Sequence, residues 1–463
     1  MAEFDIDPIL ADVDRALAEG DGPRGFALLA PFADQLERDP RLASVWLTLL
    51  RVVPGRASLK DDVARIVARW PDDRDLRLAG CDALIRAAER LGPDAPIDRD
   101  GPAARAAQLA AQGVAALSED ERRDPKIGGY WLMTHANALR LAHLHDEAQS
   151  TYTAALALDP NNGDWWFNVG LLHKAQHDFA RGLEAAERAR TLLGDRRGVL
   201  WNIAICATAL GRGEVAVDAL RALGFSPQLT AAGMPFVDGL PPLQVRVATR
   251  GGGIGFGGAD LDRGVAFELV WVSPASPVHG VVQTPTFRES SVDYGDLVLW
   301  DGTPIGVTER DRKPVPRFPL LSRLRAGDER RLRFIALEQA EGDTQRMGDA
   351  LPDGALLFVH RATVEHLCSR CASGEHMQKH KHTAPEPHRL VYGKMIVPGT
   401  IDLAAFRRAL DAHLARHPSV QIVMPSLYEA LGETATAGKA HQIWRGIERT
   451  ALKTDGAIAV PRA

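Results

Sequence analysis

Histidine and cysteine residues gather in one stretch of this 463-residue chain, from His360 to His388. It holds six of the 15 histidines and two of the four cysteines, and those two form a Cys-x2-Cys pair. Thiolate sulfur and imidazole nitrogen at such close spacing are ligands that zinc prefers in proteins. The residue types therefore predict a zinc cofactor. The candidate metal ligands are Cys368, Cys371, His376, His380, His382 and His388.

A closed zinc site is one interpretation of this stretch. The two cysteines and two of the later histidines would complete a tetrahedral shell, and such a site contributes directly to the free energy of folding. The spacing does not decide which histidines take part, because four candidates compete for two places. The plainest alternative is a solvated loop without metal, since the segment EHMQKHKHTAPEPH is polar.

Part of the stretch resembles the zinc knuckle family. Residues 368–380 carry the pattern Cys-x2-Cys-x4-His-x3-His, in which the last ligand is histidine where the family has cysteine. The resemblance implies a small zinc site of a kind that binds single-stranded nucleic acid. Because no aromatic residue stands beside Cys368 and the surroundings are not basic and aromatic, we expect the metal without nucleic-acid binding.

A second resemblance covers residues 374–393 and concerns the cupin family. The positions that match the family's first motif are Gly374, His380, His382, Glu386 and Gly393. On a strand, His380 and His382 would project to the same side, and the resemblance implies that Glu386 completes an open metal site. This motif would make the protein a metal-dependent enzyme. The family's second motif needs a later histidine on further strands, whereas the chain after residue 400 has a helical pattern.

Other patterns associated with catalysis or nucleotide binding are incomplete. Residues 253–258 have the Gly-x-Gly-x-x-Gly spacing of a dinucleotide-binding turn, but they lead into a strand instead of the required helix, which favours a hairpin loop. Residues 309–333 are rich in Lys and Arg, yet interleaved acids favour a solvated face on a segment packed against the core. Cys81 and Cys206 lie among apolar helical residues and are predicted to be inert core thiols.

Composition and charge describe an ordinary globular protein. Apolar residues make up 45% of the chain and charged residues 25%, and the length allows about three domains. A net charge of -5 and a pI near 6.3 provide no basic field for nucleic acid or an acidic membrane. The sequence has no long apolar run, no signal pattern and no disulfide framework. We therefore expect a cytoplasmic protein, and the Ala- and Arg-rich composition is typical of a bacterial gene.

The elements that must position any site begin with helices. Apolar residues recur at helical spacing through residues 1–125, which predicts helical hairpins in a bundle or solenoid. From residue 128 the pattern repeats, and Trp131, Trp166 and Trp201 follow one another at 35-residue spacing. Repetition at this length is typical of units that bury their apolar faces only against their neighbours.

Residues 128–224 resemble the tetratricopeptide repeat (TPR) family. The residues at the family's packing positions are Leu132, Ala136, Leu139, Ala148, Tyr152, Ala155 and Pro160, then Trp166, Gly170, Ala186 and Ala189, then Trp201, Ala204, Leu210 and Ala219. Small residues let two helices approach closely, and Pro160 ends a helix because proline cannot continue it. The resemblance implies a concave surface that binds a protein or peptide partner.

Beyond Gly224 the period changes from helical to that of strands. Residues 225–240 are rich in proline and are predicted to form a linker. Runs of β-branched and aromatic residues then predict a mainly antiparallel sheet or small barrel. The expected strands are 243–250, 265–273, 279–287, 296–302, 330–338 and 355–360. A helical period returns with one helix after Thr400 and another at 437–452.

These patterns together predict a multidomain α+β protein. The expected parts are degenerate helical hairpins at 1–125, TPR-like repeats at 126–224, a linker at 225–240, a β-rich metal-binding domain at 241–398 and C-terminal helices at 399–463. Because the chain has no Gly-x-Ser-x-Gly elbow, P-loop or His-Glu-x-x-His motif, no catalytic residue is assigned. We expect an intracellular adaptor or scaffold that binds a protein or peptide and carries structural zinc. The alternative is a metal-dependent enzyme whose repeats recruit its substrate.

Overall fold

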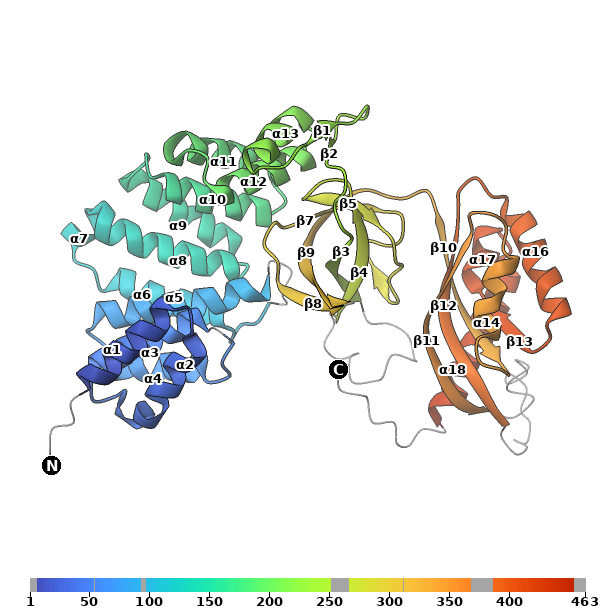
Figure 1. Cartoon of the computed structure of the whole chain (residues 1–463), viewed down its shortest axis with the longest axis horizontal. Coiled ribbons are helices and arrows are strands. Elements are labelled where there is room, and N and C mark those ends of the chain that lie inside the picture. The colour runs from blue at the N-terminus through green and yellow to red at the C-terminus, as the bar shows by residue number, and fades with distance from the viewer. Residues whose placement is uncertain are drawn as a thin grey trace. The chain divides into compact units, whose positions relative to one another are not determined.

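A computed structural model describes residues 6–53, 55–92, 97–250, 266–310, 312–367 and 386–453 of the chain. Helices form the N-terminal half, a β region follows, and further helices lie near the C-terminus (Figure 1). The chain divides into two compact units. The first comprises Met1–Gly239 with Ser276–Val278 and Trp300–Val307, and the second comprises Leu240–Ala275, His279–Leu299 and Thr308–Ala463.

The first unit begins with short amphipathic helices, as the sequence predicts. They are α1 (Asp7–Ala18), α2 (Gly22–Leu29), α3 (Pro40–Val52), α4 (Leu59–Arg69), α5 (Arg74–Leu91), α6 (Pro102–Ala115) and α7 (Glu119–Arg123). Asp21, Asp39 and Asp73 cap α2, α3 and α5, because their carboxylates accept backbone N–H groups that the first helical turn leaves without partners. One apolar core joins these helices to those that follow.

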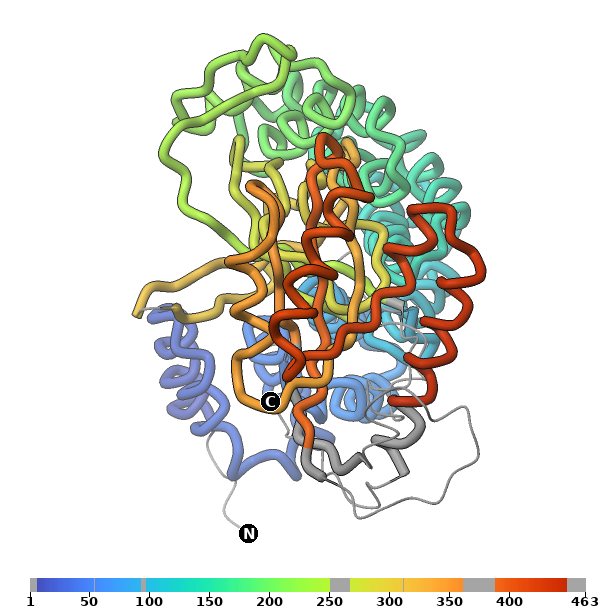
Figure 2. Tube along the Cα trace, turned by 90° about the vertical axis from the view of Figure 1, so that its right-hand side faces the viewer, coloured from blue at the N-terminus to red at the C-terminus, as the bar shows by residue number. Residues whose placement is uncertain are grey.

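Three helical hairpins follow and repeat along the sequence. They consist of α8 (Tyr130–Leu141) with α9 (His145–Leu158), α10 (Gly163–Ala175) with α11 (Phe179–Leu193), and α12 (Arg197–Ala209) with α13 (Gly213–Ala222). Their second helices start at His145, Phe179 and Gly213, so successive hairpins are 34 residues apart. The turns repeat as well, since His143 and His177 have φ angles of 60° and 61°. Figure 2 shows the hairpins stacked in sequence order, from cyan to green.

The 34-residue unit corrects the 35-residue spacing of the tryptophans. Trp131 and Trp165 occupy the same position in successive hairpins, Val199 takes that position in the third, and all three are buried. Trp166 and Trp201 are only half-buried, because they stand one and two positions further along their helices. The repeat is present, and Trp165, not Trp166, occupies the position equivalent to Trp131.

Glycines make room for the two buried tryptophans. A Cβ atom at Gly113 of α6 would lie 2.2 Å from the ring of Trp131, and one at Gly129 would lie 2.3 Å from the ring of Trp165. Carbon atoms that are not bonded do not approach so closely, and protein interiors are packed too densely for the ring to move aside freely. Each ring therefore occupies space that only a glycine leaves.

The β region contains a sheet that closes into a small barrel. Its strands are β3 (Leu243–Arg250), β4 (Ala266–Pro274), β5 (His279–Val282), β6 (Glu289–Ser290), β7 (Leu297–Trp300), β8 (Gly306–Arg310) and β9 (Lys313–Arg325). They pair in the order β6-β3-β4-β5-β7-β9-β8, and a parallel pairing between β3 and β9 closes the ring. The pairings of β3 with β4, β4 with β5 and β5 with β7 are antiparallel, so the prediction of a mainly antiparallel sheet or small barrel is confirmed.

Strands that the sequence does not predict include those in the expected linker and in the Lys- and Arg-rich segment. Residues 225–240, expected to form a linker, include a short hairpin of β1 (Gln228–Leu229) and β2 (Pro235–Phe236). Within residues 309–333, β9 has Val315 and Leu321 buried. The expectation that this segment packs on the core is therefore correct, and the buried residues belong to a long strand of the barrel.

The C-terminal region combines a four-stranded sheet with helices. Strands β10 (Arg330–Glu338), β11 (Leu356–Leu367), β12 (Glu386–Val397) and β13 (Val420–Val423) pair antiparallel in the order β11-β12-β10-β13. The helices include α14 (Asp343–Arg346), α16 (Leu403–Arg416), α17 (Pro425–Ala430) and α18 (Thr434–Lys453), which confirms the two expected helices. Phe334, Met395 and Phe406 belong to the core of this region. No helix among the described residues is long and apolar enough to cross a membrane.

We predict that Gly113→Ala destabilises the helical unit by about 1–3 kcal/mol, because the added methyl group must displace the ring of Trp131. Urea unfolding followed by circular dichroism measures the change. The matched control is Gly438→Ala in α18, where a Cβ atom meets nothing within 4 Å and helical alanine gains up to about 1 kcal/mol. Equal unfolding midpoints for Gly113→Ala and the unchanged protein would show that the ring does not depend on this space.

Candidate functional site

The predicted zinc ligands fall mainly in the segment 368–385, outside the described residues. The ligands in that segment are Cys368, Cys371, His376, His380 and His382. The sixth, His388, lies on β12 and pairs with Glu365 of β11. Pairing of β11 with β12 extends to Leu367 and Glu386, so the residues that flank the segment are neighbours in the sheet. Within the described ranges, no three His, Cys, Asp or Glu side chains are placed to hold a metal ion.

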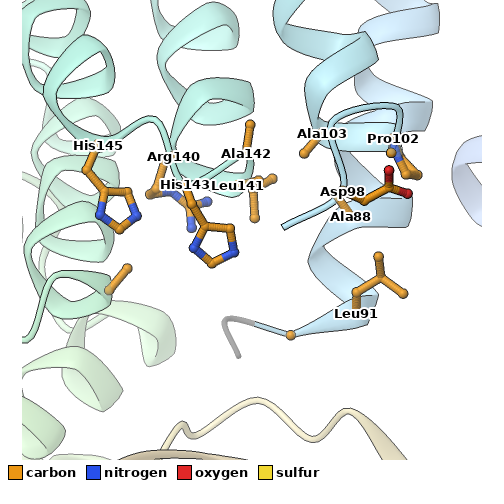
Figure 3. Close-up of a pocket in the computed structure, with 13 residues that line it drawn as sticks. Ala88, Leu91, Asp98, Pro102, Ala103, Arg140, Leu141, Ala142, His143 and His145 are labelled. Atoms are coloured by element: carbon orange, nitrogen blue, oxygen red, sulfur yellow. The ribbon is translucent and has the colours of Figure 1, made fainter. Parts of the chain in front are cut away.

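A pocket opens on the helical unit between the end of α5 and the α8–α9 turn (Figure 3). Its first wall carries the apolar side chains of Ala88 and Leu91 and the carboxylate of Asp98. Its second wall carries Arg140, His143 and His145. The pocket therefore places a largely apolar wall, which bears one carboxylate, opposite a basic wall.

The shape of the α8–α9 turn follows from His143, whose φ of 60° ends α8. The N–H of His143 donates to the carbonyl of Arg140 at 3.1 Å, and the N–H of Leu144 donates to the carbonyl of Leu139 at 2.9 Å. These bonds satisfy carbonyls that the last helical turn leaves open. Histidine adopts this left-handed conformation more readily than most residues. The turn thus brings two imidazoles beside one guanidinium.

The basic wall has hydrogen-bonding capacity that the chain itself does not use. Burial lowers the pKa of His145, and the adjacent His143 and Arg140 lower it further. The two imidazole centroids lie 5.7 Å apart. His145 Nε2 and Arg140 Nε are covered and have no hydrogen-bond partner among the residues that the structure describes. The guanidinium of Arg140 is permanently charged and lines the pocket, so this wall suits a carboxylate.

A second polar cluster is buried in the second unit, where the segment between β5 and β7 meets β12. Lys394 of β12 is 4% exposed, and its Nζ forms an ion pair with Asp293 and donates to Thr286 Oγ1 at 3.2 Å. Burial lowers the pKa of Lys394, and Asp293 opposes that shift. Lysine is almost never buried this deeply without a partner, because an isolated ammonium loses its hydration.

His360 lies beside this cluster, in a bulge of β11. Its position follows from a register shift between Val359 and Arg361 in the pairing with β12, and a bulge re-aims the side chain that it carries. The imidazole centroid lies 5.3 Å from that of Phe287. Burial lowers the pKa of His360 to about 4, Lys394 adds to the shift, and Asp293 opposes it. His360 is therefore neutral near pH 7.

The segment between β5 and β7 is held in place by its own carboxylates. Asp293 Oδ1 accepts the N–H groups of Thr286 at 3.1 Å and Tyr294 at 2.8 Å. Asp296 is 1% exposed and accepts a bond of 2.6 Å from the guanidinium of Arg331 on β10. Because the amine of Lys394 is covered and both its partners are engaged, the cluster fastens this segment to the C-terminal sheet.

Cys81 and Cys206 are free and buried, and burial raises the pKa of each thiol to about 12, which confirms two inert core thiols. The glycine motif at 253–258 lies outside the described residues. Sequence reasoning missed Lys394, although a lone charge in the apolar run LVYGKMIV is a visible signal of a buried ion pair.

Comparison with known proteins gives one partial similarity. No known family model matches the chain. Over 82 residues, which are 18% of the chain, it is 33% identical to Protein O-mannosyl-transferase TMTC1 of Mus musculus. The chain spans 9% of that relative's length. The similarity therefore concerns one segment and transfers no activity to this chain.

We predict that the second unit loses stability as the pH falls from about 6.5 towards 4, partly through His360. Its pKa is about 4 when folded and about 6.5 when unfolded, so the unfolded chain binds more protons within this window. Thermal unfolding at pH 7 and pH 5 measures the loss, and His360→Gln should make it smaller.

His279, whose pKa burial also lowers to about 4, keeps part of the dependence in that variant. The control is His417→Gln, a change at an exposed position of the same unit. If His360→Gln and His417→Gln lose the same stability between pH 7 and pH 5 as the unchanged protein, the His360 assignment is wrong.

Proposed function

We propose that this protein is a cytoplasmic adaptor whose helical unit binds a protein or peptide partner through tetratricopeptide repeats. The observation that carries the proposal is the recurrence of helical hairpins at 34 residues, the length of a tetratricopeptide unit. The partial similarity to TMTC1 supports a role in protein interaction. Free, buried thiols at Cys81 and Cys206 agree with a reducing compartment.

The pocket beside the α8–α9 turn indicates which side chains this partner should present. Leu91 is 50% exposed at its edge, so an apolar side chain of a partner can cover it. Arg140 on the opposite wall can pair with a carboxylate. The partner segment should therefore present an acidic residue next to an apolar one.

We also propose that residues 368–388 hold a structural zinc ion through Cys368, Cys371 and two of the nearby histidines. The choice of ligands rests on the sequence. The pairing of Leu367 with Glu386 supports the proposal, because it keeps the start and the end of the ligand-bearing stretch together. When bound, zinc would tie that stretch closed and stabilise the sheet from which it emerges.

We predict that Leu91→Ser weakens partner capture by about tenfold or more, since burial of a leucine side chain is worth about 1.5–3 kcal/mol. The full-length chain serves as bait, and the captured proteins are quantified by mass spectrometry. The matched control is Leu229→Ser, which changes another exposed leucine of the same unit that does not line the pocket. A capture profile that Leu91→Ser leaves unchanged would remove the pocket from the proposal.

For zinc, we expect about one metal ion in each purified chain and none in the double variant Cys368→Ser/Cys371→Ser, as measured by elemental analysis. The second unit of the double variant should unfold at a lower temperature. Cys206→Ala, which removes a buried core thiol, should keep the metal.

Two results would contradict the structural zinc site. If the purified full-length protein contains no stoichiometric metal, the alternative interpretation, a solvated loop without metal, is correct. Metal retained by the double variant would point to the open site of His380, His382 and Glu386, and hence to catalysis.

A further inference from the structure

The first unit buries a lysine on its repeated helices. Lys174 of α10 is 6% exposed. Its Nζ donates to Asn202 Oδ1 of α12 at 2.9 Å and forms an ion pair of 2.8 Å with Asp301 Oδ2. Asp301 belongs to Trp300–Val307, which is part of the same unit although it follows α12 by about 90 residues in the sequence. The buried ammonium therefore takes its carboxylate from a distant part of the chain.

The segment that supplies this carboxylate is a tight turn. Asp301 uses its second oxygen, Oδ1, to accept the N–H of Thr303 at 3.1 Å. Trp300 is fully buried, and its indole N–H donates to the carbonyl of Pro277 at 3.0 Å. These bonds fix the direction of Asp301, so that its other oxygen, Oδ2, faces Lys174.

Gly302, which follows Asp301, packs against Trp201 with little room for a side chain. A Cβ atom at Gly302 would lie 3.1 Å from the indole ring of Trp201, closer than most real Cβ contacts. Trp201 directly precedes Asn202 on α12, and its ring packs edge-on against that of Phe225, with 5.9 Å between the centroids. The repeats therefore contact the carboxylate of Asp301 and the backbone of the adjacent Gly302.

We propose that Lys174, Asn202 and Trp201 form a receptor for Asp-Gly turns, which the chain fills with its own Asp301 and Gly302. Release of this internal turn opens the receptor to an Asp-Gly segment of a partner protein. The driving force is electrostatic, because Lys174 without a carboxylate is a buried charge that has lost its counterion. The receptor is separate from the pocket beside the α8–α9 turn, so it goes beyond the function proposed above.

The internal turn has an advantage over any free competitor. Because the turn belongs to the same chain, its binding is intramolecular, so a partner must bind tightly or the turn must first be displaced. In the unchanged protein the receptor is therefore closed to weak ligands.

A synthetic peptide with the sequence of residues 299–304, LWDGTP, tests this receptor. Both ends are blocked, so the aspartate carries the only acidic group, and binding to the full-length chain is followed by fluorescence polarisation. Asp301→Ala/Gly302→Leu empties the receptor, because it removes the carboxylate and adds a side chain against Trp201. We expect this variant to bind the peptide at least about tenfold more tightly than the unchanged protein.

Two controls test the specificity of that binding. Adding Lys174→Met to the double variant should weaken binding by about tenfold or more, whereas adding Lys126→Met, at an exposed lysine of the same unit, should not. A peptide with asparagine in place of aspartate should bind about tenfold more weakly. Equal binding with and without Lys174, or no binding to the double variant, would overturn the proposal.

Chemical acetylation of Lys174, read by mass spectrometry, gives a second measurement that does not need a labelled ligand. Lys174 should resist acetic anhydride in the unchanged protein, react in the double variant, and be protected again by LWDGTP. If the double variant does not fold by circular dichroism, Gly302→Leu alone is used for both measurements. A Lys174 that reacts equally in all these proteins would contradict an internal turn that closes the receptor.

Discussion

Each helical hairpin of the first unit buries its apolar face only against the hairpins beside it. This constraint explains why glycines and tryptophans meet at the junctions, with the ring of Trp131 against Gly113 and that of Trp165 against Gly129. It also explains the hairpin of β1 and β2, which packs on α13 at the end of the stack. The carbonyl of Gly233 lies so close to Gly213 that a Cβ atom there would be 2.0 Å away. The last helix is therefore covered by chain that follows it directly.

Buried lysines show a second principle common to both units. Lys174 and Lys394 are each less than 7% exposed, and each pairs with an aspartate far away in the sequence, Asp301 and Asp293. A buried ion pair contributes little net stability compared with apolar packing, but loss of either partner is costly. Such pairs therefore specify where a segment packs, since any other placement of that segment leaves a buried charge without its counterion.

Local patterns predicted the elements, and long-range contacts limited what else could be predicted. Strands β3 and β10 match the expected 243–250 and 330–338, because alternation of side chains is visible within one strand. The repeat was found with its register wrong by one residue at Trp166 and by two at Trp201, since neighbouring apolar residues fit a helical pattern equally well. Strand β12 was not predicted, because its apolar run has no alternation. The run LVYGKMIV signals that Lys394 is a buried charge, but nothing local identifies its partner Asp293, which lies 101 residues away.

The parallel pairing of β3 with β9 has a consequence for how the chain is made. Gln244 of β3 lies opposite Arg317 of β9, so the ring of strands cannot close until more than 70 further residues have left the ribosome. Helical hairpins need only neighbouring sequence and form on a much faster timescale. During synthesis, β3 therefore waits with an open edge while the helices upstream are already folded. An unpaired strand edge is a site for misassembly between nascent chains, and closure by β9 removes that edge.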